Sequence, residues 1–322
     1  MAGQSSGFVA AVHSTGLWRD EKFPRIGRTM AVSTVRVAVT GGSGKIGSAV
    51  IEQLLERGHQ VTNIDKRQAD PVRARFVYAD LRHREVLQPT FEQVDVVCHL
   101  GEIPHAGGPL PPEEIFAHNT AVGSTVLQTA ADLGLKRVIY TSSCQVYGCW
   151  GHRPQIKPPP RLPMDETMPV NPQNVYALAK VACEEYARQL AQQKGLAVSV
   201  FRFPWVVMEA PDERWYRMLE HSTGPMEGMG TYLHISDAAR AYVQAIEQAP
   251  EGFEVYHLTA EDVWSAVPLR ERMLRTQPDF PPLPMDWPDY RSPVLCDKAK
   301  AHFGWKPTFG VRQGYERWKA SR

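Results

Sequence analysis

Tyr176 and Lys180, in the stretch "YALAK", are the residues whose types and spacing first suggest chemistry. Residues four apart on a helix share a face, so the Lys180 ammonium can lie near the Tyr176 phenol and lower its pKa. We therefore expect Tyr176 to act as a base near neutral pH. A YxxxK pair also arises by chance, and the alternative is an amphipathic helix in which Tyr176 simply packs inward.

The apolar run "KRVIYTSS" ends in a cluster of hydroxyl residues and predicts a strand whose last residue is Ser143. A strand and the helix after it are neighbours in a parallel sheet, so Ser143 can reach the same point in space as Tyr176. Ser143 would hold a substrate oxygen while Tyr176 moves its proton. Gln145, two residues further on, either points into this pocket or is an ordinary loop residue.

A glycine-rich turn lies in "VRVAVTGGSGKIGSAV", between a β-branched strand pattern and a helical apolar pattern. A P-loop is excluded, because valine and isoleucine occupy the places of its first glycine and its hydroxyl residue. The spacing fits a dinucleotide-binding turn instead. Gly41 would allow the tight turn, Gly44 would let a pyrophosphate approach, and Gly47 would let the helix pack closely on the strand.

The second strand, "HQVTNID", ends in Asp65, whose carboxylate can accept hydrogen bonds from both hydroxyls of an adenosine ribose. This favours NAD, although Lys66 or Arg67 could instead hold the 2'-phosphate of NADP. Two further strand ends place Asp80 near the adenine amino group and Gly101 beside the cofactor. The other positions that we assign to cofactor binding are Lys45, Ile46, Lys66, Leu81, Leu100, Asn119, Phe203, Pro204, Tyr176 and Lys180.

The alternation of strand and helix patterns predicts an α/β fold, with a Rossmann-type, doubly wound parallel sheet and a small C-terminal substrate lobe. We divide the chain into a leader at 1–30, a cofactor-binding core at 31–203 and a substrate lobe at 204–322. The lobe is interleaved with core elements that return at about 232–258. The leader has no periodicity, so we expect a disordered extension or an upstream start, with Met30 as an alternative beginning.

These motifs resemble the extended short-chain dehydrogenase/reductases, the NAD-dependent epimerase/dehydratase group. The resemblance runs from about Val35 to Arg317 and rests on "TGGSGKIG", the strand-end Asp65, "ADL", "HLG", "TSSCQVYG", "YALAK", "YLHISDAARA" and "FGWKPT". It implies hydride transfer between a substrate carbon and a nicotinamide ring, with Lys180 also holding the nicotinamide ribose. It further implies a homodimer formed through the YxxxK helix and an earlier long helix, expected at about 112–133.

Dehydratases of this family carry an acidic pair after the strand-end hydroxyl. Cys144 and Gln145 stand there instead, so we expect no dehydration. Only 27 residues, 205–231, separate "FRFP" from "YLHISD", which is short for family members that handle nucleotide sugars.

The short segment favours a smaller sugar or sugar acid as substrate. Arg214 and Arg217 could bind its carboxylate or phosphate, since arginine offers a bidentate fork, or could lie on a solvated loop face. Trp205 is either a pocket wall or part of the core.

Three functions remain open at this stage. The first is an NAD(P)-dependent oxidoreductase that acts on a secondary hydroxyl of a sugar derivative and releases reduced cofactor. The second is an epimerase that returns the hydride to the other face, for example a nucleotide-sugar 4-epimerase with tightly held NAD. The third is a sensor that binds NAD(P) without turnover.

Composition limits the partners. The 322 residues are 43% apolar and carry a formal charge of +1, which does not suggest nucleic acid, and no apolar run is long enough for a membrane span. The five cysteines form no CxxC pair, which argues against zinc or disulfides and for a cytoplasmic protein. We also reject a metal or triad role for His234 and Asp237, and expect Asp237 to cap the helix that follows it.

Overall fold

A computed structural model describes residues 33–69, 73–104, 110–150, 156–208, 211–221 and 227–322. The predicted leader lies outside these residues. The chain divides into two compact units, Met1–Ser33 and Thr34–Arg322, and the fold below is that of the second.

The predicted Rossmann-type sheet is confirmed: a seven-stranded parallel sheet has the order β3-β2-β1-β4-β5-β6-β9. The order reverses between β1 and β4, and the carboxyl ends of these strands form the edge at which doubly wound folds bind ligands. Its strands are β1 (Arg36–Thr40), β2 (Gln60–Asp65), β3 (Arg75–Tyr78), β4 (Val96–His99), β5 (Arg137–Ser143), β6 (Ala197–Phe203) and β9 (Phe253–His257).

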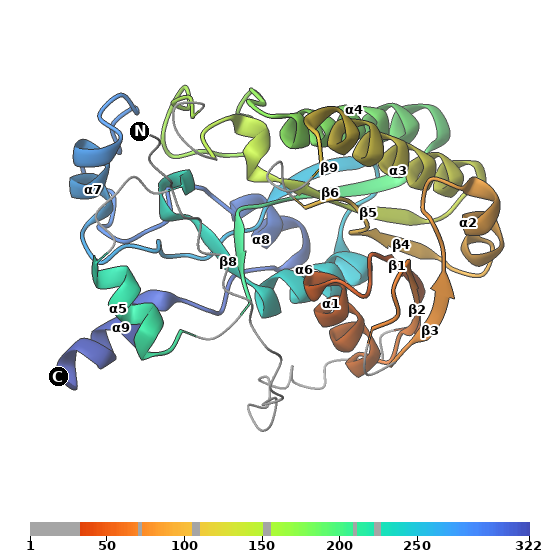
Figure 1. The fold of residues 1–322 in the computed structure, drawn as a ribbon, viewed down its shortest axis with the longest axis horizontal. Coiled ribbons are helices and arrows are strands. Elements are labelled where there is room, and N and C mark those ends of the chain that lie inside the picture. The colour runs from red at the N-terminus through yellow and green to blue at the C-terminus, as the bar shows by residue number, and fades with distance from the viewer. Residues whose placement is uncertain (1–32, 70–72, 105–109, 151–155, 209–210, 222–226) are drawn as a thin grey trace, which may run out of the picture. The chain divides into compact units, whose positions relative to one another are not determined.

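Side chains that alternate along the strands pack into two separate hydrophobic cores, one on each face of the sheet. Val37 and Val39 of β1 pack on one face with α1 and α6, whereas Ala38 between them packs on the other face with α3 and α4. Figure 1 shows these two layers of helices on either side of the sheet. The helices are α1 (Lys45–Glu56), α2 (Arg84–Phe91), α3 (Pro112–Asp132), α4 (Val175–Lys194) and α6 (Ile235–Gln248).

After Pro204 the chain adds α6 and β9 to this core and also forms smaller elements. β7 (Trp205–Val207) and β8 (Tyr232–His234) pair in parallel as a two-stranded sheet. The others are α5 (Glu213–His221), the 3-10 helix η2 (Glu227–Gly230), α7 (Leu269–Thr276), α8 (Asp297–Phe303) and α9 (Val311–Ala320). The segment 205–231 thus contains the strand β7, the helix α5 and the 3-10 helix η2.

The helix α4 begins at Val175, because the Asn174 side chain caps it by accepting the Ala177 N–H. One local expectation was wrong. Asp237 is not the cap of α6. His234 is the capping residue, and the fully buried Asp237 carboxylate instead accepts the backbone N–H groups of Thr308 and Phe309.

Candidate active site

The glycine turn after β1 is shaped by backbone contacts that leave no room for side chains. Gly41 has φ +68°, and a Cβ there would lie 2.7 Å from the Cα of Gly101. At Gly47 a Cβ would lie 2.3 Å from the Gly41 carbonyl oxygen, so this glycine packs against the turn rather than against the strand. The first turn of α1 therefore packs directly against the glycine turn, and the free N–H groups of a helix N-terminus suit a phosphate.

The Asp65 carboxylate lies at the end of β2 beside this turn. It accepts the backbone N–H groups of Ser43, at 3.1 Å, and of Arg67, at 3.1 Å. The nearby cations have other partners: Lys66 pairs with Asp80 at 2.8 Å, and the Arg67 guanidinium donates to the Ser43 carbonyl oxygen. Asp80 also binds Arg82, and hydrogen bonds from the two cations hold the pKa of Asp80 well below its usual range.

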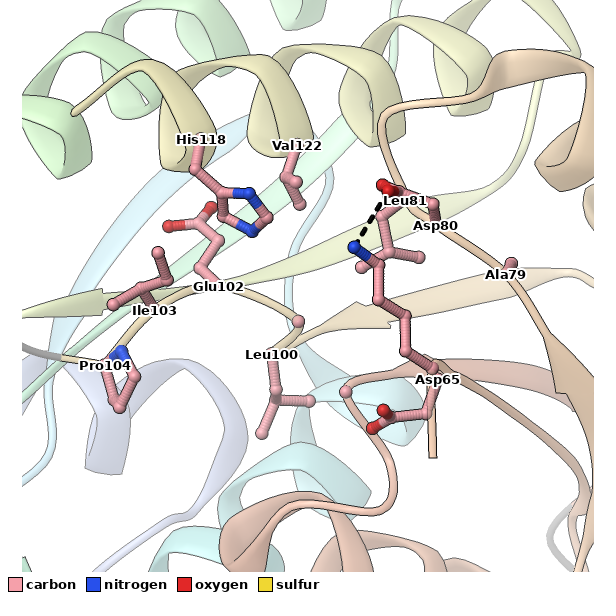
Figure 2. A pocket seen from close by; sticks show the side chains of 13 residues that line it. Asp65, Ala79, Asp80, Leu81, Leu100, Glu102, Ile103, Pro104, His118 and Val122 are labelled. Atoms are coloured by element: carbon pink, nitrogen blue, oxygen red, sulfur yellow. Dashed lines mark ion pairs between the residues drawn. The ribbon is translucent and has the colours of Figure 1, made fainter. Parts of the chain in front are cut away.

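A cavity of about 340 Å³ runs along this edge of the sheet. Figure 2 shows Asp65 and Asp80 at one end and Glu102, His118 and Val122 at the other. Seven of its lining residues were predicted: Gly41, Asp65, Lys66, Asp80, Leu81, Leu100 and Gly101. The other lining residues were not: Ala79, Glu102, Ile103, Pro104, His118 and Val122. Of these, Glu102 had a sequence signal, because a charged residue directly follows the buried strand and turn "HLG".

Asn119 supports the wall of this cavity from behind. Its side chain is fully buried in α3, accepts the Ile103 N–H at 2.9 Å and donates to the Ile103 carbonyl oxygen at 3.0 Å. Both hydrogen bonds go to the backbone of Ile103. They fix the strand-to-helix segment that carries Glu102.

Ser143, Tyr176 and Lys180 come together at the carboxyl end of β5, all less than a tenth exposed. The Ser143 hydroxyl lies close enough to the Tyr176 phenol to lower its pKa. The Lys180 ammonium lies 5.6 Å from the centroid of the Tyr176 ring and donates to the Thr141 carbonyl oxygen at 2.6 Å. This arrangement can hold a substrate oxygen and exchange a proton with it.

The expected fall in the pKa of Tyr176 is not found; the net shift is upward. Burial raises this pKa most, the Lys180 ammonium lowers it, the Glu102 carboxylate raises it, and the nearby Ser143 hydroxyl lowers it. The YxxxK spacing reveals only Lys180; neither the burial of the phenol nor the nearby Glu102 carboxylate can be seen from it. The positive charge of an oxidised nicotinamide ring would act in the same direction as Lys180.

The positions that might contact substrate differ in their surroundings. Gln145, in the 3-10 helix η1 (Cys144–Tyr147), accepts the Asn174 side-chain N–H at 2.9 Å. Trp205 is 46% exposed and stacks on Trp215 with ring centroids 5.9 Å apart, while Trp264 meets both edge-on. The structure thus supplies an accessible aromatic surface next to the end of β6.

Arg214 and Arg217 lie on α5, and both are exposed. The Arg217 guanidinium pairs with Glu213 on the same helix.

The remaining positions assigned to the cofactor lie at the end of β6 and in the glycine turn. Phe203 of β6 pairs in register with Ser143 of β5. A Cβ at Gly44 would lie 3.2 Å from the Gly41 carbonyl oxygen. Lys45 and Ile46 are the first two residues of α1. Among the described residues, no group of three or more His, Cys, Asp or Glu side chains is arranged to hold a metal ion.

Comparison with known proteins agrees with this architecture. Residues 37–258 match the profile of the NAD dependent epimerase/dehydratase family. A probable UDP-arabinose 4-epimerase of Arabidopsis thaliana is 24% identical over 270 residues, 69% of this chain, and the chain spans only 64% of that relative. A UDP-glucose 4-epimerase of Corynebacterium glutamicum is 25% identical over 312 residues, which cover 85% of this chain and 91% of the relative.

Solved structures share the fold. A UDP-glucose 4-epimerase from Thermotoga maritima, crystallised with UDP-glucose, superposes with a TM-score of 0.64 at 21% identity. The match covers 89% of this chain and 99% of that one.

Proposed function

The chain belongs to the NAD dependent epimerase/dehydratase family, and from this premise we propose that it transfers a hydride to and from a secondary hydroxyl carbon of a sugar derivative. Tyr176 moves the hydroxyl proton, Ser143 holds the oxygen, and Lys180 fixes the nicotinamide ribose. The observation that carries the proposal is the convergence of these three buried side chains at the end of β5.

The turn and cavity fit a dinucleotide. The close backbone contacts at Gly41 and Gly47 leave a side-chain-free surface for a pyrophosphate, and Asp65 lines the cavity where a ribose would lie. Bound NAD would supply the hydride acceptor and donor. We favour NAD over NADP, because a 2'-phosphate would meet the Asp65 carboxylate while Lys66 is paired with Asp80 and Arg67 contacts Ser43.

We propose that the reaction is not a dehydration. Cys144 and Gln145 occupy the place of the acidic pair that the family's dehydratases carry there. The Cys144 thiol is fully buried, and burial raises its pKa well above the usual range, so it stays protonated near neutral pH and does not act as a base there. Gln145 carries an amide, which does not titrate.

For the substrate we favour a sugar or sugar acid without a nucleotide, because the segment 205–231 is short. The alternative is a nucleotide sugar, since the named relatives act on UDP-arabinose and UDP-glucose. The flat surface of Trp205 suits either the apolar face of a sugar or a base. Turnover measured on UDP-glucose and UDP-arabinose, beside a panel of free sugars and sugar acids, separates the two.

The fate of the hydride distinguishes an oxidoreductase from an epimerase. An epimerase must keep its cofactor between half-reactions, whereas a dehydrogenase exchanges it in each turnover. Mass spectrometry of the small molecule released by acid from the purified protein decides between them. Close to one NAD per chain favours an epimerase, and its absence favours a dehydrogenase.

Replacing Tyr176 with Phe tests the proposed chemistry. Positioned acid–base groups contribute about 100-fold to 10,000-fold to a rate, so we expect Tyr176→Phe to lower kcat by that factor while NAD still binds. Tyr186→Phe is the matched control: it removes a phenol from the same helix, where the hydroxyl bonds to Gln128. Equal activity in both variants would overturn the assignment, and a protein that only senses NAD would lose nothing in either.

We also propose that the protein is a cytoplasmic homodimer, paired through α3 and α4 as the family resemblance implies. No helix among the described residues is long and apolar enough to cross a membrane. Analytical ultracentrifugation of the full chain tests the dimer.

A further inference from the structure

A buried carboxylate, Glu102, lies between the cavity and the catalytic lysine. Its side chain is only 3% exposed, and its Oε2 atom lies 2.7 Å from the Lys180 ammonium nitrogen. Its Oε1 atom lies 3.1 Å from the His99 Nε2 atom, and the Tyr140 hydroxyl approaches Oε2 at 3.4 Å. A buried charge survives only when it is paired and hydrogen-bonded, and Glu102 meets both conditions.

Neighbouring elements leave room for this side chain. A Cβ at Gly123 of α3 would lie 3.0 Å from the Glu102 Oε1 atom and 2.5 Å from the Cys183 sulfur. Asn119, one turn earlier on the same helix, holds the backbone next to Glu102 through Ile103. The carboxylate is therefore held in place from three sides: by α3, by His99 of β4 and by Lys180 of α4.

The contacts also account for the position of Lys180. An ammonium has three N–H bonds, and here one points to the Thr141 carbonyl oxygen and another to Glu102. The third can meet a ribose hydroxyl. Together these two acceptors hold the lysine ammonium beside the Tyr176 ring.

We propose that Glu102 is a positioning residue for the reaction: it fixes the Lys180 ammonium beside Tyr176 and keeps it charged inside the buried site. This proposal rests on the proposed function, in which Lys180 acts with Tyr176. It adds a fourth side chain, from the loop after β4, to the set that the YxxxK and serine motifs predict.

The balance of charge around Lys180 supports this role. Burial lowers the pKa of Lys180, but the Glu102 carboxylate and the Tyr176 phenol raise it, and the net shift is upward. Conversely, burial raises the pKa of Glu102, but Lys180 and His99 bring it to about 2. The titratable groups around the pair are His99 of β4, Tyr140 of β5, His118 of α3, and Tyr176, Cys183 and Glu184 of α4.

NMR of lysine labelled with ¹³C at Cε tests the proposal without any turnover, with the Lys180 signal assigned from Lys180→Met. In the wild-type protein, Lys180 should titrate above the ordinary lysine pKa of 10.5 despite its burial. In Glu102→Gln, which keeps the size of the side chain and removes its charge, we expect the Lys180 pKa to fall by about one pH unit or more. Glu102→Asp keeps the charge and should retain most of the wild-type value.

Glu247→Gln is the matched control, because it also removes a carboxylate with a buried side chain from an ion pair, here between α6 and Arg57. It should leave the Lys180 titration near that of the wild type. An unchanged Lys180 pKa in Glu102→Gln, or an equal fall in both variants, would overturn the proposal.

If Glu102→Gln does not fold, the wild-type titration still tests the proposal, because a Lys180 pKa below 10.5 would contradict the ion pair between Glu102 and Lys180. Activity in Tyr176→Phe would refute the proposed function but leave this result standing.

Discussion

At the scale of single residues, the cofactor turn depends on positions where only glycine fits. Gly41 adopts a positive φ and faces Gly101, and Gly47 lies against the Gly41 carbonyl oxygen. These contacts are made by backbone atoms, which cannot swing away as the end of a flexible side chain can. A side chain at either position must therefore move the turn itself.

For Gly47→Ala we expect at least about a tenfold loss of NAD affinity, because the new methyl group would displace the Gly41 carbonyl. Overpacking of this kind typically costs about 1–3 kcal/mol of stability. Gly134→Ala is the control: its φ of +63° makes alanine costly, but nothing lies within 4 Å of the added Cβ. Titration calorimetry with NAD and urea unfolding measure both effects. The assignment of the turn fails if Gly47→Ala binds NAD like the wild type.

At the scale of elements, Asp237 joins α6 to the segment that leads into α9. Its Oδ2 atom accepts the N–H groups of Thr308 and Phe309, each at 2.9 Å, and its Oδ1 atom pairs with Arg240. The residue is fully buried. One carboxylate thus satisfies backbone groups about 70 residues away and anchors the C-terminal segment to the Rossmann core.

Asp237→Asn should lower the free energy of unfolding by about 3 kcal/mol, because an amide cannot accept all of these donors and leaves Arg240 without its charge partner. Glu213→Gln breaks the exposed pair with Arg217 and should cost less than about 1 kcal/mol. Urea unfolding of the two variants gives the comparison. If the two substitutions lower the free energy of unfolding by similar amounts, Asp237 does not anchor the C-terminal segment.

At the scale of the whole molecule, a buried polar network connects the sheet to the chain that follows it. His257 lies at the end of β9. Its Nε2 atom forms a hydrogen bond with the Tyr147 hydroxyl at 2.5 Å, and its Nδ1 atom lies 3.2 Å from the Leu295 carbonyl oxygen. Its backbone N–H donates to Glu166 at 2.8 Å. Burial lowers the pKa of His257 to about 3.

This pKa predicts an acid sensitivity of the whole fold. Between pH 6.5 and pH 3 the unfolded chain binds a proton at this site that the folded chain does not, so the stability contribution is complete above about pH 6.5 and is lost as the pH falls. His257→Gln should therefore lose stability less steeply on acidification, by up to about 1.4 kcal/mol per pH unit. Urea unfolding at several pH values from 7.5 to 4.5 measures the slopes. Parallel curves for the two proteins would contradict a buried, neutral His257.

The sequence by itself determined the fold class, the glycine turn, the acidic end of the second strand and the serine, tyrosine and lysine set. These signals are local: each depends on spacing within one turn, one strand end or one helix face. Asp237, the upward shift in the pKa of Tyr176 and the pairing of Glu102 with Lys180 were decided only by the tertiary structure. Glu102 and Lys180 are 78 residues apart in the sequence. Burial and contacts between distant segments set the charge balance of this site, and neither follows from the periodicity of a single element.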